Sequence, residues 1–449
     1  MRRHENGALR PGWEAQIRSE GLVYSLTRRG DTDVSYWREA QYYSFSSADI
    51  EALATAANEL FAMCVVAGDH IIGHDLFDRL GIPAWAVPAI VTSWNDESSP
   101  DRFSPSVLGR FDLRYGNDPA LVAVDPSLAV PKLLEFNADT PTSLLETAVI
   151  QWNWLLGNDA VAHRDQWNNV YDALVAAWRR NLDQWRDRTG RQIDVVHFLF
   201  SSLDDSGEDE FNVATMADAA KAAGVEVVVD HIENISLVQH PDEAPVPLGG
   251  VAATPGRFID RDGRDIDIAF KLYPWETLAH DAWGKTVLLN TLDAGTAAGT
   301  SWIEPPYKML WSNKGLLPVL WELFRDDPER SRYLLPAYFA GREPTGFLSY
   351  AEKPLLGREG ANIRLVRDGA VLQADPGPYG AEGFVRQELA PLPDFAGVDG
   401  PHHPVLGVWM IDGEAAGLGI RESDGLITDN QSYFVPHAII DDPEKGVRS

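Results

Sequence analysis

The segment KLLEFNADTPTSLLETAVIQ, Lys132 to Gln151, is most informative when it is combined with GRFDLR, Gly109 to Arg114. Apolar and polar residues alternate at the start of the first segment and throughout the second, which predicts two β-strands. Two polar residues share one face of each predicted strand: Arg110 and Asp112 in GRFDLR, and Glu135 and Asn137 in KLLEFN. We expect these four side chains to converge on one cleft.

These four residue types suit a magnesium-bound triphosphate. Mg²⁺ prefers hard oxygen ligands, so Asp112, Glu135 and Asn137 are candidate metal ligands. Arg110 would place a fixed cation beside the phosphoryl group that is transferred. The pattern therefore favours ATP chemistry with Mg²⁺ as cofactor.

The composition is that of a soluble globular protein, with 449 residues, 45% hydrophobic residues and 23% charged residues. The formal net charge of -29 is expected to repel nucleic acid and anionic membranes, and to favour cationic partners such as polyamines. An acidic surface that serves solubility is the alternative reading of the same charge. We expect small-molecule partners, with no nucleic acid and no membrane.

The amino-terminal sequence MRRHENGALRPGWEAQ lacks the apolar stretch of a signal peptide. The sequence also lacks an unbroken apolar run that approaches the roughly 18 residues required to span a bilayer. These features predict a cytoplasmic protein. The single cysteine, Cys64, lies in the apolar segment FAMCVVAG, which predicts a buried small side chain rather than a nucleophile.

Periodicity predicts the framework around the two strands. Residues Ser46 to Ile72 have apolar positions at helical spacing behind a Ser/Asp start, which predicts a helix. The segment LLETAVIQWNWLL predicts a second helix, which begins after Thr140 to Ser143, and GNDP at 116–119 predicts a turn between the strands. Five aromatic residues are expected to pack on the first helix: Tyr36, Trp37, Tyr42, Tyr43 and Phe45.

The rest of the chain predicts an α+β fold with three parts. Gln192 to about Pro255 alternates strand, loop, helix and strand, as in a parallel βαβ unit. Beyond it, Asp-Gly pairs at 262–263, 368–369 and 412–413 predict hairpin-like turns in a largely antiparallel carboxyl-terminal half. We predict a core part at 1–190, an α/β substrate-binding subdomain at 191–260 and a nucleotide-binding part at 261–449, with a frayed tail at 441–449.

Two lysines precede segments suited to phosphate contact. Lys314 opens an apolar-striped helix, and Lys353 ends a strand before the GREG loop of Gly357 to Gly360. Backbone donors of this loop and the planar guanidinium of Arg358 are candidates for phosphate contact. A plain surface turn is the alternative for the loop.

An acidic loop, DDSGEDEF at 204–211, follows the strand-like VVHFLF. Ligand-binding groups commonly lie at the carboxyl ends of such strands, so Glu208 and Asp209 are candidates to bind a substrate ammonium group. A solvated charge run is the alternative. The spaced glycines at 413–430 lack the layout of a dinucleotide fingerprint, and no Walker A sequence occurs.

Six short motifs occur in the order of a known family: RFD, LLEFNADTPTSLLE, FKLYPWE, NKGLLPVLW, KPLLGREGANI and GIRE with ITDN. Together they extend over nearly the whole chain. The chain resembles the glutathionylspermidine synthase family, specifically stand-alone synthetase-like members that lack the amidase domain. The resemblance implies a circularly permuted ATP-grasp fold, in which antiparallel sheets clamp ATP.

The resemblance also implies residue roles. Metal ligands would be Asp112, Glu135 and Asn137, and catalytic arginines would be Arg110, Arg358 and Arg421. Nucleotide-binding residues would be Lys314, Lys353 and Gln387, beside the loop glycines Gly357 and Gly360. Substrate-binding residues would be Thr140, Thr142, Ser143, Glu208 and Asp209. Ser143 stands where bifunctional members have a cysteine near the glutathione thiol.

The function implied is an ATP-dependent ligase that joins a carboxylate to an amine through an acyl phosphate. The donor would be a short peptide or amino-acid carboxylate, and the acceptor an amine or polyamine. Glutathione and spermidine are one such pair, and a different pair stays open. Two other functions also stay open: an ATP-binding regulatory protein with weak ATPase activity, and a kinase-like phosphotransferase.

Overall fold

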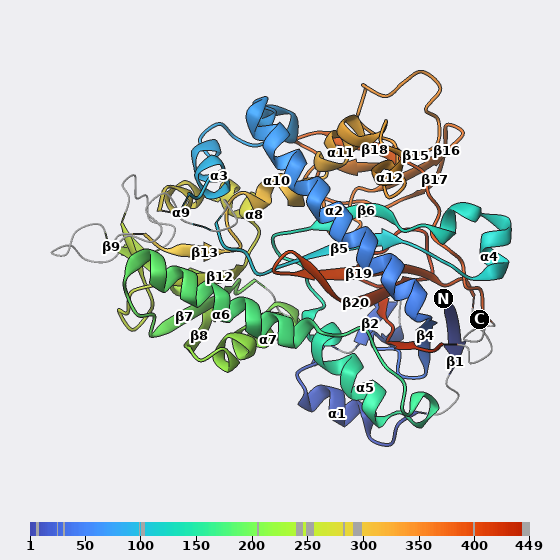
Figure 1. The fold of residues 1–449 in the computed structure, drawn as a ribbon, viewed down its shortest axis with the longest axis horizontal. Helices are drawn as coiled ribbons and strands as arrows, with labels where there is room; N and C mark the ends of the chain where they lie inside the picture. The colour runs from blue at the N-terminus through green and yellow to red at the C-terminus, as the bar shows by residue number, and fades with distance from the viewer. Residues whose placement is uncertain are drawn as a thin grey trace, which may run out of the picture.

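The computed structural model describes residues 1–5, 9–24, 26–29, 32–97, 99, 104–203, 206–238, 246–247, 256–281, 283–290, 299–397 and 400–441. Helices and sheets are intermixed along these residues, and several sheets are antiparallel (Figure 1). The predicted α+β class is confirmed. The predicted tail at 441–449 lies outside the described residues except for Asp441.

The first of two large antiparallel sheets lies at the centre of the molecule (Figure 1). It has five strands in the order β21-β20-β19-β5-β6. The strands are β21 (Tyr433–Phe434), β20 (Glu414–Ser423), β19 (His403–Ile411), β5 (Leu108–Arg114) and β6 (Lys132–Asn137). We refer to it as the central sheet. Strands from both halves of the sequence therefore meet in one sheet.

The second antiparallel sheet is built only from the carboxyl-terminal half. Its five strands have the order β14-β18-β15-β16-β17, and we refer to it as the upper sheet from its place in Figure 1. The strands are β14 (Ala337–Phe339), β18 (Phe384–Glu388), β15 (Tyr350–Pro354), β16 (Arg364–Arg367) and β17 (Ala370–Ala374).

A parallel sheet of four strands has the order β13-β12-β7-β8. Its strands are β13 (Ser301–Ile303), β12 (Ile268–Leu272), β7 (Val195–Phe200) and β8 (Glu226–His231). Helix α7 (Glu208–Ala222) connects β7 to β8, so the predicted βαβ unit is confirmed. The sheet continues past residue 260 through β12 and β13, so the subdomain boundary predicted there does not coincide with its edge.

Smaller elements complete the fold. Three small sheets are formed by β1 (Arg2–Glu5), β4 (Gln41–Phe45) and β22 (His437–Ile439); by β9 (Ser236–Val238), β10 (Val246–Pro247) and β11 (Arg257–Ile259); and by β2 (Leu26–Arg29) and β3 (Thr32–Ser35). The other helices are α1 (Trp13–Ser19), α2 (Ser47–Gly73), α3 (Val87–Trp94), α4 (Pro119–Val124), α5 (Gln151–Gly157), α6 (Val170–Thr189), α8 (Trp275–His280), α9 (Gly284–Asn290), α10 (Lys308–Ser312), α11 (Leu316–Phe324) and α12 (Pro328–Ser331).

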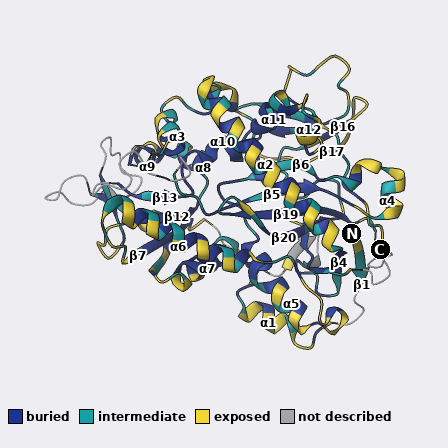
Figure 2. Ribbon diagram, viewed as in Figure 1, coloured by how far each residue is buried: buried dark blue, intermediate teal, exposed yellow. Residues whose placement is uncertain are grey.

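Helix α2 confirms the helix predicted from Ser46. The Ser46 side chain accepts a hydrogen bond from the backbone of Asp49, and Asp49 accepts one from Ser46, which forms a capping box. The helix packs on β19 and β20 and on α10 and α11. One side of α2 is buried and the other exposed (Figure 2), and Cys64 is fully buried as predicted.

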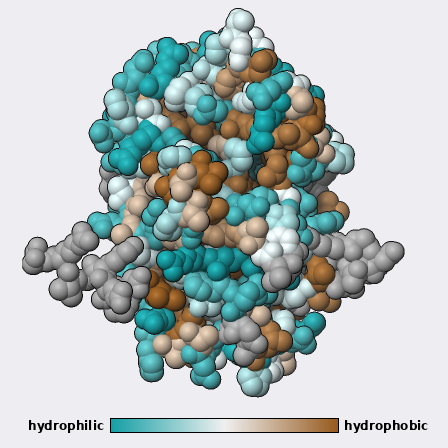
Figure 3. Space-filling model, turned by 90° about the vertical axis from the view of Figure 1, so that its right-hand side faces the viewer, coloured by the Kyte–Doolittle hydropathy of each residue, from teal (hydrophilic) through white to brown (hydrophobic). Residues whose placement is uncertain are grey.

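By length and composition alone, α2 would be able to cross a membrane. Charged residues such as Glu51, Glu59 and Asp69 interrupt this helix, so the prediction that the sequence has no unbroken apolar run of about 18 residues is not contradicted. The capping box of α2 and its packing on the central sheet are features of a core helix. One side face of the molecule mixes hydrophilic and apolar residues (Figure 3), as water-exposed protein surfaces do.

The aromatic residues before α2 divide between two cores. Tyr43 and Phe45 belong to the core cluster that contains the buried face of α2. In contrast, Tyr36, Trp37 and Tyr42 belong to a separate cluster, with Trp154 of α5. The prediction that all five pack on α2 is therefore wrong for these three, because the chain crosses from one core to the other within this segment.

The predicted turns have mixed outcomes. Asp368-Gly369 joins β16 to β17 and Asp412-Gly413 joins β19 to β20, with positive φ at each residue, as two-residue hairpin turns require. Asp262-Gly263 also lies in a tight hairpin-like turn, in which Ile259 and Asp265 form an antiparallel bridge, and β12 after it joins the parallel sheet. The GNDP turn leads into α4, and the helix predicted after Ser143 contains a π-helical turn at Glu146–Ile150.

Gly68 lies where α2 meets the ring of Trp94. A Cβ atom on Gly68 would lie 2.3 Å from Trp94 Cη2. We expect Gly68→Ala to lower the free energy of unfolding by about 1–3 kcal/mol, since overpacking outweighs the roughly 1 kcal/mol gain in helix propensity. Urea and thermal unfolding measure this change.

Gly73→Ala is the matched control, because nothing lies within 4 Å of the added Cβ atom. We expect this variant to be neutral or slightly stabilised, as propensity alone would dictate. An equal gain in stability for Gly68→Ala would contradict the close contact between α2 and Trp94.

Candidate nucleotide and substrate cleft

Strands β5 and β6 pair in an antiparallel register that places the four predicted polar residues side by side. Arg110 lies opposite Asn137, and Asp112 lies opposite Glu135. On the other face Phe111 and Phe136 are buried and stacked, with ring centroids 4.0 Å apart. The apolar contact and the polar group thus lie on opposite faces of one strand pair.

A glycine on the neighbouring strand makes room for Arg110. Gly407 of β19 lies opposite Asp112, and a Cβ atom there would lie 2.8 Å from Arg110 Cδ. The absence of a side chain at Gly407 lets the Arg110 side chain lie across β19. Arg110 then donates to both carboxylate oxygens of Asp112, at 2.7 and 3.1 Å, and to the carbonyl oxygen of Thr142 at 2.6 Å.

The two carboxylates differ in charge environment. Burial raises the pKa of Asp112, although the Arg110 guanidinium opposes this. Burial also disfavours the charged form of Glu135, but the positive charges of Lys314 and Lys353 outweigh this effect and hold the pKa of Glu135 at about 2.

Lys314 and Asn137 make direct contacts with these two carboxylates. Lys314 Nζ lies 2.9 Å from Glu135 Oε2 and donates to the carbonyl oxygen of Gly357 at 2.5 Å. Asn137 Nδ2 donates to Asp112 Oδ2 at 3.1 Å.

Lys353 and Gln387 connect the upper sheet to β6. Lys353 Nζ donates to Gln387 Oε1 at 2.8 Å and to the carbonyl oxygen of Leu134 at 2.9 Å. Gln387 Nε2 donates to the carbonyl oxygen of Leu133 at 2.9 Å. Burial lowers the pKa of Lys353 to about 8, although the nearby Glu135 charge opposes this.

The cleft at this junction has a volume of about 630 Å³, and an adjoining recess has about 120 Å³. The cleft is lined by Arg110, Asp112, Glu135, Asn137, Thr140, Thr142, Ser143, Glu208, Asp209, Arg358, Gly360 and Arg421. The recess is lined by Lys353 and Gln387 and by apolar residues that include Ile363, Leu365, Leu392 and Ile427. Lys314 and Gly357 line neither cavity and lie behind Glu135. Hence all the predicted site residues occur in one region.

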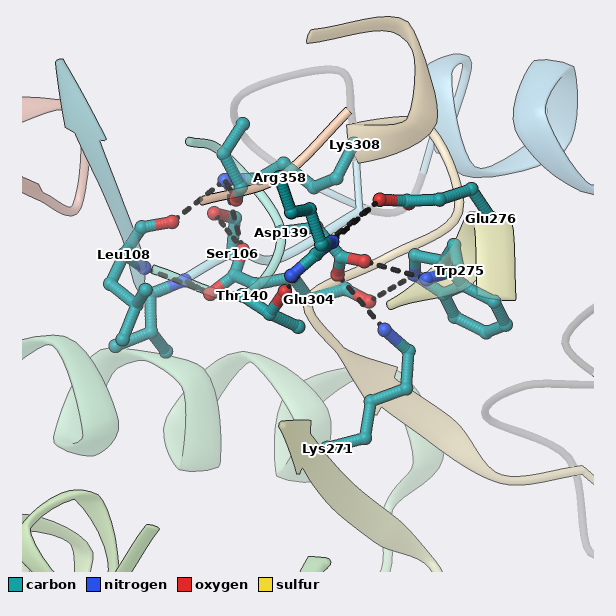
Figure 4. Close-up of polar contacts among 12 residues, drawn as sticks. Ser106, Leu108, Asp139, Thr140, Lys271, Trp275, Glu276, Glu304, Lys308 and Arg358 are labelled. Atoms are coloured by element: carbon teal, nitrogen blue, oxygen red, sulfur yellow. Dashed lines mark hydrogen bonds and ion pairs between the residues drawn. The ribbon is translucent and has the colours of Figure 1, made fainter. Parts of the chain in front are cut away.

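Arg358 connects the glycine loop to two distant segments (Figure 4). Its guanidinium donates to Glu276 Oε1 of α8, at 2.9 and 3.3 Å, and to Thr140 Oγ1 at 2.9 Å. The sequence prediction missed Glu276, although it belongs to the quoted motif FKLYPWE. The motif therefore drew attention to Glu276, but its contact with Arg358 could not be predicted, because 82 residues separate the two in the sequence.

Two buried ion pairs support the loop that follows β6 (Figure 4). Lys271 Nζ lies 2.9 Å from Asp139 Oδ1, and both side chains are fully buried. Lys308 Nζ lies 3.0 Å from Glu304 Oε2 and donates to the carbonyl oxygens of Leu108 and Ala138. These pairs fix the start of β5 and the end of β6 relative to the parallel sheet. Glu304 and Lys308 are four residues apart, a spacing typical of ion pairs, whereas Asp139 and Lys271 are 132 residues apart and their pairing could not be predicted from spacing.

Backbone strain marks the start of the helix after β6. Ser143 has φ +69°, an unusual value for a residue with a side chain, and its buried Oγ has no partner among the described residues. Its carbonyl oxygen accepts from the Thr147 backbone at 3.2 Å. Ser143 thus lines the cleft while its hydroxyl oxygen lies buried just behind the cleft wall. Arg421 lies across the cleft and donates to the carbonyl oxygen of Asp429 at 2.8 Å.

An acidic corner closes the other end of the cleft. Glu208 and Asp209 lie in the first turn of α7 and line the cleft. Tyr36 also lines it and donates to Glu146 Oε1 at 2.7 Å. Burial raises the pKa of Glu146 to about 7, with a contribution from the Glu208 charge. The sequence did not identify Tyr36 or Glu146 as residues of the cleft. Tyr36 was expected to pack on the first helix, and Glu146 lies within the segment predicted as the second helix.

Comparisons with known proteins show which family the chain resembles. The model of the family "Glutathionylspermidine synthase preATP-grasp" matches residues 4–440. The protein named "Putative acid--amine ligase" from Haemophilus influenzae is 32% identical, with 98% of this chain and 100% of that protein aligned. The trypanothione synthetase of Crithidia fasciculata is 27% identical over 94% of this chain and 59% of that protein.

Two further comparisons extend this result. The bifunctional glutathionylspermidine synthetase/amidase of Escherichia coli is 26% identical over 89% of this chain and 59% of its own length. The chain thus spans 59% of the length of this protein and of the trypanothione synthetase. A solved structure of a glutathione synthetase-like effector from Globodera pallida has the same overall fold, with a TM-score of 0.50 and 11% identity over 95% of this chain and 96% of that one.

The extent of the family match and the identity over nearly the full length of the Haemophilus influenzae protein lead to one assignment. The chain belongs to the glutathionylspermidine synthase preATP-grasp family.

Proposed function

We propose that this chain is an ATP-dependent carboxylate–amine ligase that forms an amide bond through an acyl-phosphate intermediate. The observation that carries the proposal is the meeting of Arg110, Asp112, Glu135 and Asn137 with Lys353 and Gln387 between two antiparallel sheets. Membership in a family whose relatives are named as ligases supports it. In this proposal the fold is a circularly permuted ATP-grasp fold, and the parallel sheet forms a substrate-binding subdomain.

ATP would lie across the two cavities. The recess has an apolar lining suited to the adenine ring, with Gln387 and Lys353 as its polar contacts. The triphosphate would extend toward Glu135 and Lys314, under the loop of Gly357 and Gly360. Lys353 and Lys314 would then exchange their present acceptors for phosphate oxygens, which carry more negative charge.

The donor set fits Mg²⁺. No group of three His, Cys, Asp or Glu side chains is placed to hold a metal ion among the described residues. Mg²⁺ at a nucleotide needs only one or two protein carboxylates, because phosphates and water supply the other oxygens. Asp112, Glu135 and Asn137 would hold it. When bound, Mg²⁺ would neutralise phosphate charge.

The arginines would serve the transfer step. A substrate carboxylate attacks the terminal phosphorus of ATP, the bond to the bridging oxygen breaks, and ADP leaves. Negative charge spreads over the transferred phosphoryl oxygens during this step, so fixed cations stabilise the transition state. Arg110, Arg358 and Arg421 line the cleft from three different segments and would supply this charge. The amine then attacks the acyl carbon, and phosphate leaves.

The two substrates would use opposite ends of the cleft. Thr140, Thr142 and Ser143 offer hydroxyl groups near Arg110 and Arg358, suited to the carboxylate donor. Glu208 and Asp209 form the acidic corner, suited to an amine or polyamine. Glutathione and spermidine are the first pair to test, given the names of the relatives. The cytoplasmic location, and the absence of nucleic-acid and membrane partners, remain predictions from the sequence.

The direct test is a panel of carboxylates against amines with ATP and Mg²⁺, with ADP release and product mass followed together. We expect a new amide that requires both substrates. We also expect Asp112→Asn and Glu135→Gln to lower product formation by about 100-fold or more, since each loses charge that orients the metal-bound phosphates. Glu51→Gln, on the exposed side of α2, is the matched control.

Other outcomes would contradict the ligase proposal in distinguishable ways. ADP release without any amide, and without stimulation by substrates, would indicate an ATP-binding regulatory protein. A stable phosphorylated product that forms without amine would indicate a kinase-like transferase.

Arg110→Ala separates binding from chemistry. We expect nucleotide affinity to remain close to that of the unmodified protein and kcat to fall by about 100-fold, because a cation that meets developing charge acts mainly on the barrier. Calorimetric titration with a non-hydrolysable ATP analogue and steady-state kinetics measure the two effects. Arg342→Ala, at an exposed position, controls for the loss of a guanidinium. A fully active Arg110→Ala enzyme would remove this residue from the mechanism.

Glu276→Gln tests how Arg358 is positioned. The change keeps a hydrogen-bond acceptor but removes the charge that pairs with Arg358. We expect turnover to fall by roughly tenfold, as loss of one charged hydrogen bond would give. Glu343→Gln is the matched control, because Glu343 pairs with Arg386 and lines neither cavity. Equal activity of both variants would show that the anchor of Arg358 is dispensable.

A further inference from the structure

Two histidines, His70 and His74, lie four positions apart at the carboxyl-terminal end of α2. The helix ends at Gly73, and His74 follows as its C-cap residue. Residues at this spacing lie one above the other on the same side of a helix. The two imidazole rings are in contact, with centroids 4.1 Å apart and ring planes inclined by 33°. His70 is half-buried and His74 is exposed, so the pair lies at the surface of the molecule.

A hydrogen bond of His74 determines which of its ring nitrogens is free. His74 Nδ1 lies 3.0 Å from the carbonyl oxygen of His70. A carbonyl oxygen only accepts hydrogen bonds, so Nδ1 carries the proton, and Nε2 of the neutral ring keeps its lone pair. Histidines that bind metals nearly always donate their second ring N–H to a carbonyl, a carboxylate or water. The His74 ring is therefore held as the ring of a metal ligand is held.

The separation of the two rings suits one metal ion. Zn²⁺ binds imidazole nitrogen at about 2.0–2.1 Å, so two nitrogens bound to one tetrahedral ion lie about 3.3 Å apart. Small rotations of the two side chains would bring rings with centroids at 4.1 Å to this distance. Histidines four positions apart on a helix face are also the spacing with which the His-Glu-x-x-His motif binds Zn²⁺. The segment HIIGH at 70–74 has this spacing without the glutamate, so it indicates binding and not hydrolysis.

The surroundings of the pair favour a cation. A positive charge beside the last turn of a helix is stabilised by the helix dipole, and the net charge of -29 attracts cations to the molecule. Glu322 of α11 and Arg79 act on the charge of His70 in opposite directions. In the part of the chain that the structure describes, no group of three His, Cys, Asp or Glu side chains is placed around a metal ion. Water would therefore complete the coordination.

We propose that His70 and His74 together bind one divalent transition-metal ion, such as Zn²⁺, Ni²⁺ or Cu²⁺, at the surface of α2. Imidazole nitrogen suits these ions, whereas Mg²⁺ prefers oxygen ligands. The bound ion would connect two successive turns and so stabilise the end of the helix. Neither histidine lines the cleft or the recess, and the site does not depend on the function proposed above.

Calorimetric titration of the full chain with zinc chloride and with nickel chloride tests the proposal. Nucleotide is omitted because it would chelate the metal, and excess Mg²⁺ is present to occupy oxygen sites. We expect one bound ion per chain that His70→Gln and His74→Gln each weaken by at least about tenfold, since even changes beyond the direct ligands cost 10–100-fold. Binding to the native state should also raise the Tm, and both variants should lose this rise.

Electron paramagnetic resonance with one equivalent of Cu²⁺ identifies the ligands directly. We expect superhyperfine coupling to two imidazole nitrogens in the unmodified chain, and coupling to one or none after either substitution. His280→Gln is the matched control, because His280 is an exposed histidine of α8 that lies apart from this pair. It should bind metal as the unmodified chain does, and circular dichroism checks that every variant is folded.

Three results would overturn the proposal. The absence of transition-metal binding would leave the His74 ring as a helix cap alone. Binding that Asp112→Asn abolishes and both histidine variants keep would belong to the nucleotide cleft. One ion per two chains, with dimers in sedimentation, would indicate a bridge between copies in place of a site within one helix.

Discussion

In the antiparallel pair of β5 and β6, Arg110 lies opposite Asn137 and Asp112 lies opposite Glu135. A slip of one residue would turn each side chain of one strand to the other face. The stacked rings of Phe111 and Phe136 oppose such a slip, because it would move one of them out of the core. The apolar contact beneath the sheet therefore determines which oxygens face the cleft, and the rest of the site is arranged around them.

Three carboxylates in and around the cleft each form an ion pair with a cationic side chain. Asp112 pairs with Arg110, Glu135 with Lys314, and Glu276 with Arg358. Each of these cations would bind phosphate in the proposed reaction, and Asp112 and Glu135 would turn to the metal ion. Asp112 and Glu135 would exchange one cation for another, and Glu276 would keep its contact with Arg358, so none of these three carboxylates would be left as an isolated charge. The low pKa of Glu135 shows how strongly its two lysine neighbours hold it ionised.

A buried layer behind the cleft connects it to the parallel sheet. Asp139 and Lys271 form a fully buried pair, and Glu304 accepts hydrogen bonds from the backbone of Val107 and Leu108 at the start of β5. Removing one member of such a pair leaves an uncompensated buried charge. This layer gives the ends of β5 and β6 little freedom, which suits a site that must align several groups within a fraction of an ångström.

The sequence by itself determined the two motif strands, the capped helix α2, the βαβ unit and two Asp-Gly hairpins, because each depends on local periodicity or turn geometry. It also named the polar residues of the cleft, partly through alternation and partly through family motifs. Tertiary structure alone decided that β12 and β13 extend the parallel sheet, that Tyr36 and Glu146 border the cleft, and that Glu276 anchors Arg358. These features join residues far apart in the chain. Periodicity reports only which face of an element is buried, and says nothing of which distant element covers it.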